Sequence, residues 1–543
     1  MAQFDLDVHA GASVLPGSGF AVARWTGVQL SDIAHAWNAL FSTRFIADVL
    51  CADANDPAPS RAHAACFPLA PPELLRDAMR CALGLAPSDQ SLAARLDVLG
   101  SQSRSYFAAG AHMAAAARDR GWVHHALWLG PYPTLLLGAG RFARLVPMNL
   151  LPSTNGLAVA AGTSKWVGRD VLRAHGLPVA DGRPVDSAAA AARAARSIGY
   201  PVVLKRSRGG NSDGVIVGVA NEAACRAAAR KLLRGDSPIL VERQHHGIEL
   251  RLHFVAGRLH SAFQASPYVV HGDGRTPIGT LIARAHPDYW DVKRGLAWHR
   301  DRLVLATWAA GVRTFGDLER IVPRPGVIVR VSAASGANMS PVRIVRALPS
   351  RDRARLETFL ATLGAPSAGI DVMVPRLGAG FDDGAVILEM NVPCGTGYLP
   401  DVEAVAALDL RAVADAIPGF ARAGGRVPTW IVLDHDFARP SIRRAVRSAF
   451  ARAFQGGVEV RAGHDAAAWP AALQQPSAGA LLLIVPSELL STQGIPAFLA
   501  PTWVVPTSVD AALRSAPDVA AMVVNAAGRV EALHGFAARG LTR

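Results

Sequence analysis

Acidic residues lie inside two strongly apolar segments of this 543-residue chain, and they limit its fold more than any other feature. Asp371 interrupts AGIDVMV (368–374), and Glu389 and Asn391 interrupt GAVILEMNV (384–392). Both segments read as strands, and the turn-rich RLGAGFDDG between them predicts that they are adjacent. Glu389 and Asn391 are two residues apart, so they face one side of a strand. A buried carboxylate is costly without a partner, so the three side chains predict a metal site; the alternative is two acidic strand ends facing solvent.

The composition limits the classes of protein to which the chain can belong. Half of its residues are apolar, yet no run approaches the roughly 18 apolar residues of a membrane span, and MAQFDLDVHAG is not a signal peptide. Its five cysteines show no metal-ligand spacing, and an odd number cannot close into a full disulfide set. We therefore expect a cytoplasmic chain without a membrane partner. The net charge of +13 is spread along the sequence, which favours anionic small substrates and argues against nucleic acid.

Lysine is scarce in this chain, and arginine carries nearly all of the positive charge. The four lysines are Lys165, Lys205, Lys231 and Lys293. Lys165 opens a predicted helix at 164–175, and Lys205 ends a predicted strand, YPVVLKR. The glycine-rich GGNSDG at 209–214 follows, where backbone amides can approach a phosphate. A lysine side chain carries a compact positive charge of the kind that suits a phosphate oxygen. We interpret the other two as surface residues.

Helices and strands alternate from residue 163 onward. Further helices are predicted at 187–197 and 222–233, and strands at 237–243 and 249–263, the last with a turn at 256–257. The Gly- and Arg-rich stretch 421–428 is a candidate linker, and the strands beyond it predict a small α/β domain at 426–543. Residues 1–125 form a predicted N-terminal domain without an assigned role. The central domain then covers 126–425, with a lead-in at 126–162.

The region from about 126 to 415 resembles the ATP-grasp ligases, most closely the ligase module of cyanophycin synthetase and of the bifunctional glutathione synthetases. The resemblance rests on the D…ExN set of the two acidic strands, on the two placed lysines and on VVHGDGRTPIGTLI (269–282). It implies an α/β (α+β) chain with an ATP-grasp fold at 126–425. The implied cofactors are ATP and Mg²⁺, with Mn²⁺ as an alternative metal.

The resemblance also implies a role for each matching residue. Lys165 and Lys205 would hold the nucleotide phosphates, beneath a lid that contains Gly209, Gly210 and Gly214. Glu242 and Glu249, seven residues apart, would take the adenine hinge and the ribose hydroxyls. Arg251 and Arg330 would stabilise the transferred phosphoryl group or the acyl phosphate, although both also fit as ordinary surface arginines. The metal ligands would be Asp371, Glu389 and Asn391.

Some residues near these motifs receive no role. His245 and His246 are interpreted as solvated loop residues, because no third metal-type ligand is spaced near them. Cys394 is interpreted as a small buried residue. At Gly210 and Asp213 the family usually has an asparagine and a basic residue, which puts the phosphate contact of the lid in question.

Departures on the acceptor side of the family's site bear on the substrates. FQASP (263–267) replaces consecutive arginines, and VSAASGAN (331–338) replaces an asparagine-rich stretch. No GxxxxGK[ST] loop of a Mur-ligase-like module occurs, and no glutamate–cysteine ligase module precedes the region. The resemblance implies an ATP-dependent carboxylate–amine ligase that acts on small amino-acid or peptide substrates through an acyl phosphate. The alternatives are a phosphotransferase without amine capture, a non-catalytic ATP-binding scaffold and a basic nucleic-acid binder. Homo-oligomerisation is left open.

Overall fold

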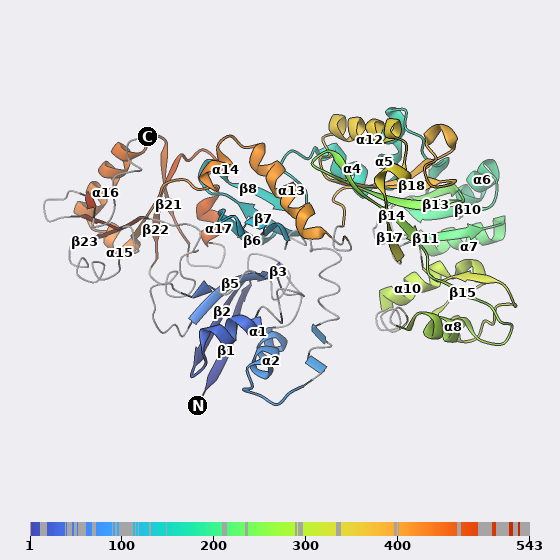
Figure 1. The fold of residues 1–543 in the computed structure, drawn as a ribbon, viewed down its shortest axis with the longest axis horizontal. Coiled ribbons are helices and arrows are strands. Elements are labelled where there is room, and N and C mark those ends of the chain that lie inside the picture. The colour runs from blue at the N-terminus through green and yellow to red at the C-terminus, as the bar shows by residue number, and fades with distance from the viewer. Residues whose placement is uncertain are drawn as a thin grey trace. The chain divides into compact units, whose positions relative to one another are not determined.

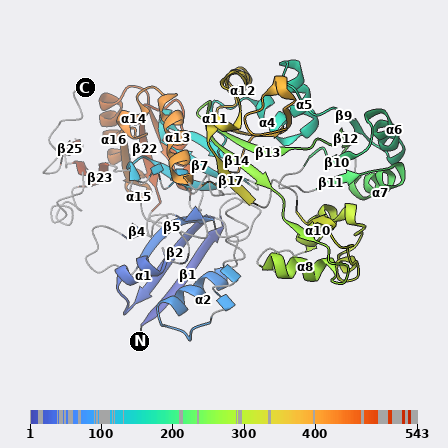
Figure 2. The ribbon, with the colours of Figure 1, turned by 45° about the vertical axis from the view of Figure 1, so that its right-hand side comes forward.

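A computed structural model of the chain separates it into two compact units (Figures 1 and 2). The first unit joins Met1–Pro152 to Gly395–Arg543, and the central unit is Ser153–Cys394. The structure describes residues 2–10, 19–37, 40, 46–47, 51–52, 61–67, 72–89, 91–92, 95–96, 112–114, 116–117, 119–129, 132–147, 149–208, 214–233, 237–287, 290, 297–332, 338–395, 399, 401–463, 468–486, 502–506, 521–524 and 530–532. Both units mix helices with sheets, so the α+β fold class is confirmed. Among the described residues, no helix combines the length and apolar character needed to cross a membrane.

The N-terminal part of the first unit is an antiparallel sheet with two helices. Its strands are β1 (Gln3–Ala10), β2 (Gly19–Thr26), β3 (Ile46–Ala47), β4 (Cys51–Ala52) and β5 (Arg61–Phe67). The helices α1 (Leu30–Trp37) and α2 (Pro72–Ala82) bury Trp37 and Met79 in a core shared with Phe4 and Trp25. A second antiparallel sheet follows, made of β6 (His124–Leu129), β7 (Tyr132–Leu137) and β8 (Arg144–Pro147).

The C-terminal part of the first unit contains a mostly parallel sheet, in the order β21-β22-β20-β23-β24-β25. The strands are β20 (Thr429–Leu433), β21 (Gly457–Arg461), β22 (Ala480–Val485), β23 (Thr502–Pro506), β24 (Ala521–Val524) and β25 (Val530–Ala532). Alternate residues enter different cores: Trp430 packs with α16 (Pro440–Ala453), whereas Ile431 packs on the opposite face. The remaining helices are α13 (Val402–Asp415), α14 (Phe420–Ala423), α15 (Asp434–Phe437) and α17 (Ala468–Leu473).

The predicted linker at 421–428 is packed into the first unit. Gly424 and Gly425 are buried, and their carbonyls accept hydrogen bonds from the amides of Val123 and Ala139, each at 2.9 Å. Both glycines have positive φ, and a Cβ on Gly425 would approach the Phe420 ring to 2.8 Å. The two glycines therefore allow close backbone packing. The Gly- and Arg-rich composition of the segment did not distinguish this role from that of a flexible linker.

The first sheet of the central unit has the order β11-β10-β12-β9, and neighbouring strands are antiparallel. Its strands are β9 (Gly182–Val185), β10 (Val202–Arg206), β11 (Val215–Val219) and β12 (Ile239–Arg243). The predicted helices are confirmed as α6 (Ala188–Ile198) and α7 (Glu222–Leu232), with the side chains of Ser187 and Asn221 as N-caps. Both helices pack their alanine-rich faces against this sheet (Figure 1).

The second sheet of the central unit has the order β17-β14-β13-β18-β19. It contains β13 (Ile248–Val255), β14 (Arg258–Ser266), β17 (Asn338–Val342), β18 (Ala368–Val374) and β19 (Val386–Asn391). The tight turn between β13 and β14 is confirmed, with positive φ at Ala256 and Gly257. The two acidic strands β18 and β19 are antiparallel neighbours, as predicted.

The remaining elements of the central unit surround these sheets. They are α4 (Gly156–Thr163), α5 (Lys165–Ala174), α8 (Ile278–Ala285), α10 (Ala297–Ala306), α11 (Ile344–Ala347), α12 (Ser350–Leu363), β15 (Val269–His271) and β16 (Ile328–Arg330). The last two strands pair with each other and share a small core with α8 and α10. Helices α4 and α5 lie against β19, so they support the strand that carries Glu389 and Asn391.

The contact between α4 and the end of β19 can be tested by substitution. A Cβ on Gly162 would lie 2.2 Å from the Val392 nitrogen, whereas a Cβ on Gly156 would meet nothing within 4 Å. Alanine favours a helix by up to about 1 kcal/mol over glycine, but overpacking typically costs about 1 to 3 kcal/mol. We expect Gly162→Ala to lower the free energy of unfolding in urea and Gly156→Ala to leave it unchanged or raise it. Equal stability of the two variants would contradict this contact.

Candidate functional site

The two placed lysines converge because the start of α5 is joined to the end of β10. Ser164 caps α5 by accepting a hydrogen bond from the Val167 amide, and Lys165 is the first helical residue. The Lys165 amide in turn donates to the Ser207 carbonyl at 2.9 Å. This backbone bond places Lys165 beside the strand that carries Lys205, forty residues further along the chain.

Glu242 is a buried carboxylate that two cations neutralise. In the β10–β12 pair Lys205 lies opposite Leu240, so Glu242 is its diagonal neighbour on the same face. Lys205 Nζ lies 2.8 Å from Glu242 Oε2, and Arg169 of α5 forms an ion pair with Oε1. Burial alone would lower the pKa of Lys205, but Glu242 and Glu389 raise it, so this lysine stays protonated.

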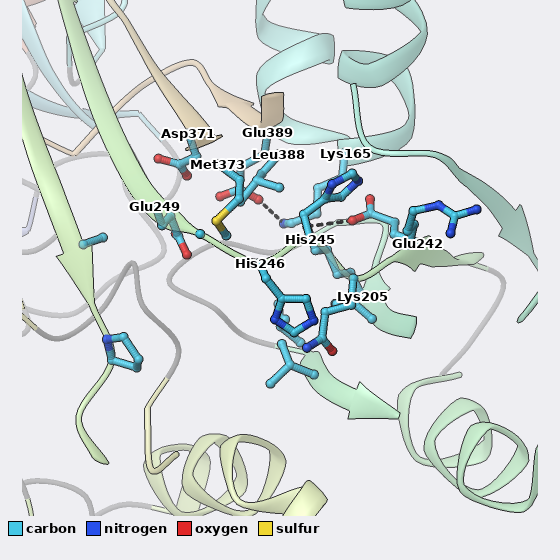
Figure 3. A pocket seen from close by; sticks show the side chains of 18 of the residues that line it. Lys165, Lys205, Glu242, His245, His246, Glu249, Asp371, Met373, Leu388 and Glu389 are labelled. Atoms are coloured by element: carbon cyan, nitrogen blue, oxygen red, sulfur yellow. Dashed lines mark ion pairs between the residues drawn. The ribbon is translucent and has the colours of Figure 1, made fainter. Parts of the chain in front are cut away.

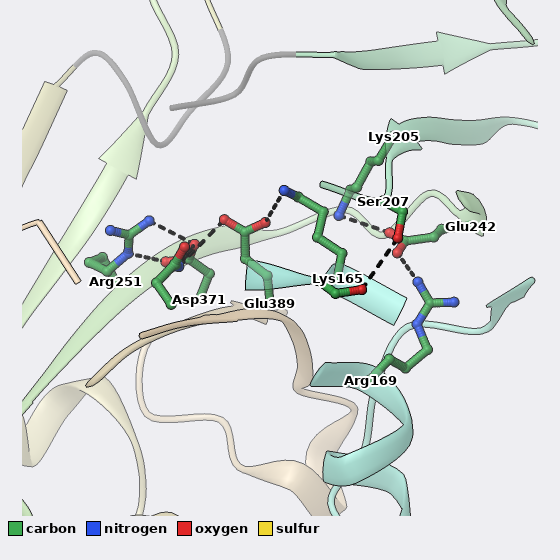
Figure 4. A network of polar contacts seen from close by, with 10 residues as sticks. Lys165, Arg169, Lys205, Ser207, Glu242, Arg251, Asp371 and Glu389 are labelled. Atoms are coloured by element: carbon green, nitrogen blue, oxygen red, sulfur yellow. Dashed lines mark hydrogen bonds and ion pairs between the residues drawn. The ribbon is translucent and has the colours of Figure 1, made fainter. Parts of the chain in front are cut away.

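The second sheet supplies a row of charges across three strands (Figure 4). Arg251 of β13 is the register partner of Asp371 on β18, and Asp371 is the register partner of Glu389 on β19. Arg251 binds Asp371 with two hydrogen bonds, one of them at 2.8 Å from Nη2 to Oδ2. Lys165 Nζ lies 3.6 Å from Glu389 Oε2. Asn391 completes the row, with its Nδ2 3.5 Å from both Asp371 Oδ2 and Glu389 Oε1.

The two facing carboxylates differ in how readily they ionise. Burial raises the pKa of Asp371 to about 6, although Arg251 opposes this shift. Burial acts upward on Glu389 as well, but Lys165, Lys205 and Arg251 together outweigh it and lower the pKa of Glu389 to about 2. Two carboxylates held this close repel each other unless a cation lies nearby.

The donor set is suited to a hard divalent cation. Asp371 and Glu389 supply two carboxylates and Asn391 an amide oxygen, and Mg²⁺ typically binds one or two carboxylates together with substrate phosphates. Among the described residues, no group of three or more His, Cys, Asp and Glu side chains forms a self-sufficient metal cage. These residues therefore fit an ion that arrives with phosphate better than one that the protein binds alone.

A cavity of about 260 Å³ opens between the two sheets of the central unit (Figure 3). It is lined by both lysines, by Glu242, Glu249, Asp371 and Glu389, and by Arg330. Apolar side chains complete the lining: Val203, Val215 and Val217 from the first sheet, and Met373 and Leu388 from the second. A ligand in the cavity would thus contact both charged and apolar side chains.

Glu249 faces the same cavity from β13. Burial raises the pKa of Glu249 to about 7, and the nearby charge of Asp371 adds to this shift while Arg330 opposes it. Arg330 is anchored by its own hydrogen bond from Nε to the Ser332 carbonyl at 2.8 Å. The two residues predicted to meet the ribose and the phosphoryl group therefore both line the cavity.

Other predicted residues fall outside this cluster. Gly209 and Gly210 lie outside the described residues. Gly214 is described, with a φ of 70°, and a Cβ there would strike the Arg206 side chain at 2.5 Å. Lys231 makes a surface ion pair with Asp301 at 3.6 Å, in agreement with its interpretation as a surface residue.

Two residues acquire importance only in the structure. Arg169 is buried and paired with Glu242, and its position one helical turn after Lys165 is the sequence signal that places both on one face of α5. His245 and His246 both line the cavity (Figure 3). His245 is half-buried, which differs from its interpretation as a solvated loop residue, whereas His246 is exposed. Cys394 is buried, as predicted, with its sulfur 3.9 Å from Nδ1 of His253.

Comparison with known proteins finds similarity within the central unit. Residues 163–249 match the family model of the ATP-grasp domain. Cyanophycin synthetase of Trichormus variabilis is 26% identical over 153 residues, which are 28% of this chain and 17% of that protein. The D-alanine–D-alanine ligase of Geobacter sulfurreducens is 34% identical over 111 residues, 20% of this chain and 35% of the ligase. The chain thus spans well under half of either relative.

Two solved structures are similar to part of the chain at low sequence identity. The bifunctional glutathione synthetase of Pasteurella multocida is 17% identical with a TM-score of 0.28, covering 58% of this chain and 45% of that one. The D-alanine–D-alanine ligase of Bacillus anthracis is 15% identical with a TM-score of 0.30, covering 50% and 71% of the two chains. The predicted resemblance to ATP-grasp ligases, with cyanophycin synthetase among them, is confirmed.

The raised pKa of Glu249 predicts a pH-dependent effect on stability. The folded chain keeps this proton up to about pH 7, whereas a free glutamate loses it near 4.5, so ionisation of Glu249 penalises folding as the pH rises through that window. Glu249→Gln should therefore raise the melting temperature more at pH 8 than at pH 5, measured in EDTA without nucleotide. Glu319→Gln, at an exposed position of the same unit, should show no such difference. An equal effect of Glu249→Gln at both pH values would contradict the raised pKa of Glu249.

Proposed function

We propose that the chain is an ATP-dependent carboxylate–amine ligase that forms an amide or peptide bond through an acyl phosphate. The observation that carries this proposal is the convergence of Asp371, Glu389 and Asn391 beside Lys165, at a cavity that Asp371, Glu389 and Lys165 line. The relatives reported above are named as ligases or synthetases, which supports the same reaction class. The substrate carboxylate would be that of a small amino acid or peptide.

The charged residues of the cavity fit the first half-reaction. Lys165 and Lys205 would bind phosphate oxygens, and Asp371, Glu389 and Asn391 would hold Mg²⁺. The ion would neutralise negative charge between the phosphates. The γ-phosphoryl group would pass to a substrate carboxylate oxygen, giving ADP and an acyl phosphate. Arg330 would stabilise the charge that develops, because it lines the cavity and is fixed by its bond to Ser332.

The second half-reaction needs no nucleophile from the protein. A substrate amine would attack the acyl carbon, inorganic phosphate would leave with the electron pair of the broken C–O bond, and the amine would lose a proton. Catalysis would then consist of positioning and electrostatic stabilisation. A screen for phosphate release with ATP, Mg²⁺ and a matrix of amino acids and short peptides, followed by product masses, tests this function. ADP formation with a phosphorylated product and no requirement for an amine would favour a phosphotransferase, and the absence of turnover together with nucleotide binding would favour a scaffold.

The metal assignment predicts a large loss of rate in one isosteric variant. Glu389→Gln keeps the size of the side chain but removes a charged ligand, and loss of a transition-state electrostatic contact costs about 3 to 4 kcal/mol, about a hundredfold or more in rate. We expect phosphate release to fall by at least this factor while the circular dichroism spectrum stays the same. Asn391→Ala should behave similarly, and Glu319→Gln should retain activity. Normal turnover of either site variant would remove the metal assignment.

The phosphate assignment predicts that lysine cannot be replaced by arginine at position 205. Lys205→Ala should weaken ATP binding by about ten- to hundredfold, as expected for one charge-assisted contact. Lys205→Arg should restore this only in part, because a planar fork fits a point-charge site poorly and must also share Glu242 with Arg169. Lys231→Ala, at the surface pair with Asp301, is the matched control and should bind ATP normally. Full ATP affinity of Lys205→Ala would refute the assignment.

A further inference from the structure

His245 carries a buried polar atom without a protein partner. The residue lies in the loop between β12 and β13, and Figure 3 shows its ring among the side chains that face the cavity. Its Nε2 is shielded from solvent and has no hydrogen-bond partner in the described part of the chain. Leaving such an atom unpaired is unfavourable, because it has lost its hydrogen bond to water and gained none, so the site favours a ligand that supplies a partner.

Of the neighbouring polar side chains, Glu242 of β12 and Gln244 of the loop are already engaged, and His246 of the loop is exposed. Both carboxylate oxygens of Glu242 face cations, Lys205 at 2.8 Å and Arg169, and the residue is only 2% exposed. Gln244 Oε1 accepts a hydrogen bond from the Gly218 amide at 2.7 Å. His245 is therefore the side chain of this loop that has a buried polar atom to offer a ligand.

The apolar lining of the cavity indicates which part of a ligand His245 would meet. Valines of β10 and β11 line it from one sheet, and Met373 and Leu388 line it from the other. A planar heteroaromatic ring fits between two apolar walls and presents polar atoms only along its edge. The loop of His245 directly follows β12, the neighbour of β10 in the first sheet.

We propose that His245 is a specificity-determining residue that binds the edge of the purine base through Nε2. This rests on the proposed function, because it requires a nucleoside triphosphate in the cavity. Burial lowers the pKa of His245, so its imidazole is neutral and one ring nitrogen donates while the other accepts. A donating Nε2 would bind N7 of the purine, and an accepting Nε2 would bind the 6-amino group. The protein would then distinguish nucleotides by an atom of the base edge rather than through Glu242.

Two ATP analogues separate these contacts. Binding of ATP, of 7-deaza-ATP, which lacks N7, and of purine riboside triphosphate, which lacks the 6-amino group, is measured by calorimetry with Mg²⁺ and without other substrates. We expect the full-length chain to bind ATP about tenfold more tightly than one of the two analogues. His245→Leu should bind ATP about tenfold more weakly and bind that analogue as well as it binds ATP. His271→Leu, at an exposed histidine on β15, should keep both values.

The outcomes separate this inference from the proposed function. If His245→Leu keeps the unaltered chain's preference for ATP, or if the unaltered chain binds all three nucleotides equally, His245 does not select the base and the inference is overturned. If the unaltered chain binds none of them, the proposed function fails. Melting temperatures establish that the variants fold. If His245→Leu does not fold, His245→Gln is decisive, because an amide in place of the imidazole should change the ratio between ATP and the analogues, and an unchanged ratio overturns the inference.

Discussion

The carboxylates of Asp371 and Glu389 face each other on adjacent strands, and other parts of the central unit must neutralise their charge. Asp371 and Glu389 are register partners, so the hydrogen-bonding of β18 to β19 forces them together. Their charge is balanced from both sides, by Arg251 on the next strand and by Lys165 at the start of α5. Each cation needs its own support: Arg251 the pairing of β13 with β18, and Lys165 the backbone bond to Ser207. The two sheets and α5 therefore all contribute to neutralising these two carboxylates.

Under the proposed function, the cations paired with carboxylates in this structure are also those that would bind phosphate. Asp371 and Glu389 would hold Mg²⁺, whose charge would balance theirs, and Lys165 would turn from Glu389 to the phosphate oxygens. At Lys205 the exchange differs, because Arg169 would remain on Glu242 when Lys205 turned away. Glu242 would thus stay neutralised throughout. A buried carboxylate that lost its only cation would incur a large desolvation cost, so the second cation makes the exchange easier.

The sequence carries most of the information about the central sheets, because their strands combine apolar patterns with clear turns. The placement of Asp371 and Glu389 on adjacent strands followed from the short turn-rich connection between them. Contacts that depend on tertiary register were less accessible. The buried pairing of Arg169 with Glu242 joins a helix to a strand 73 residues away. Helical spacing puts Arg169 on the same face as Lys165, but nothing local identifies Glu242 as its partner. Gly424 and Gly425 likewise read as flexible, because the backbone they pack against lies far away in sequence.

Gly182 leaves room for the buried ion pair between Arg169 and Glu242. A Cβ on Gly182 would lie 2.6 Å from Arg169 Nη1 and 2.9 Å from the Glu242 side chain, so the absence of a side chain there allows this ion pair to form beneath β12. Because Glu242 also pairs with Lys205, Arg169 and the proposed phosphate-binding lysine share one carboxylate. A ligand that shifts Lys205 would therefore alter the electrostatic environment of the loop that follows β12 and contains His245, because the charges of Glu242 and Lys205 both act on His245. Through this shared carboxylate, occupancy of the phosphate site would affect how the base is held.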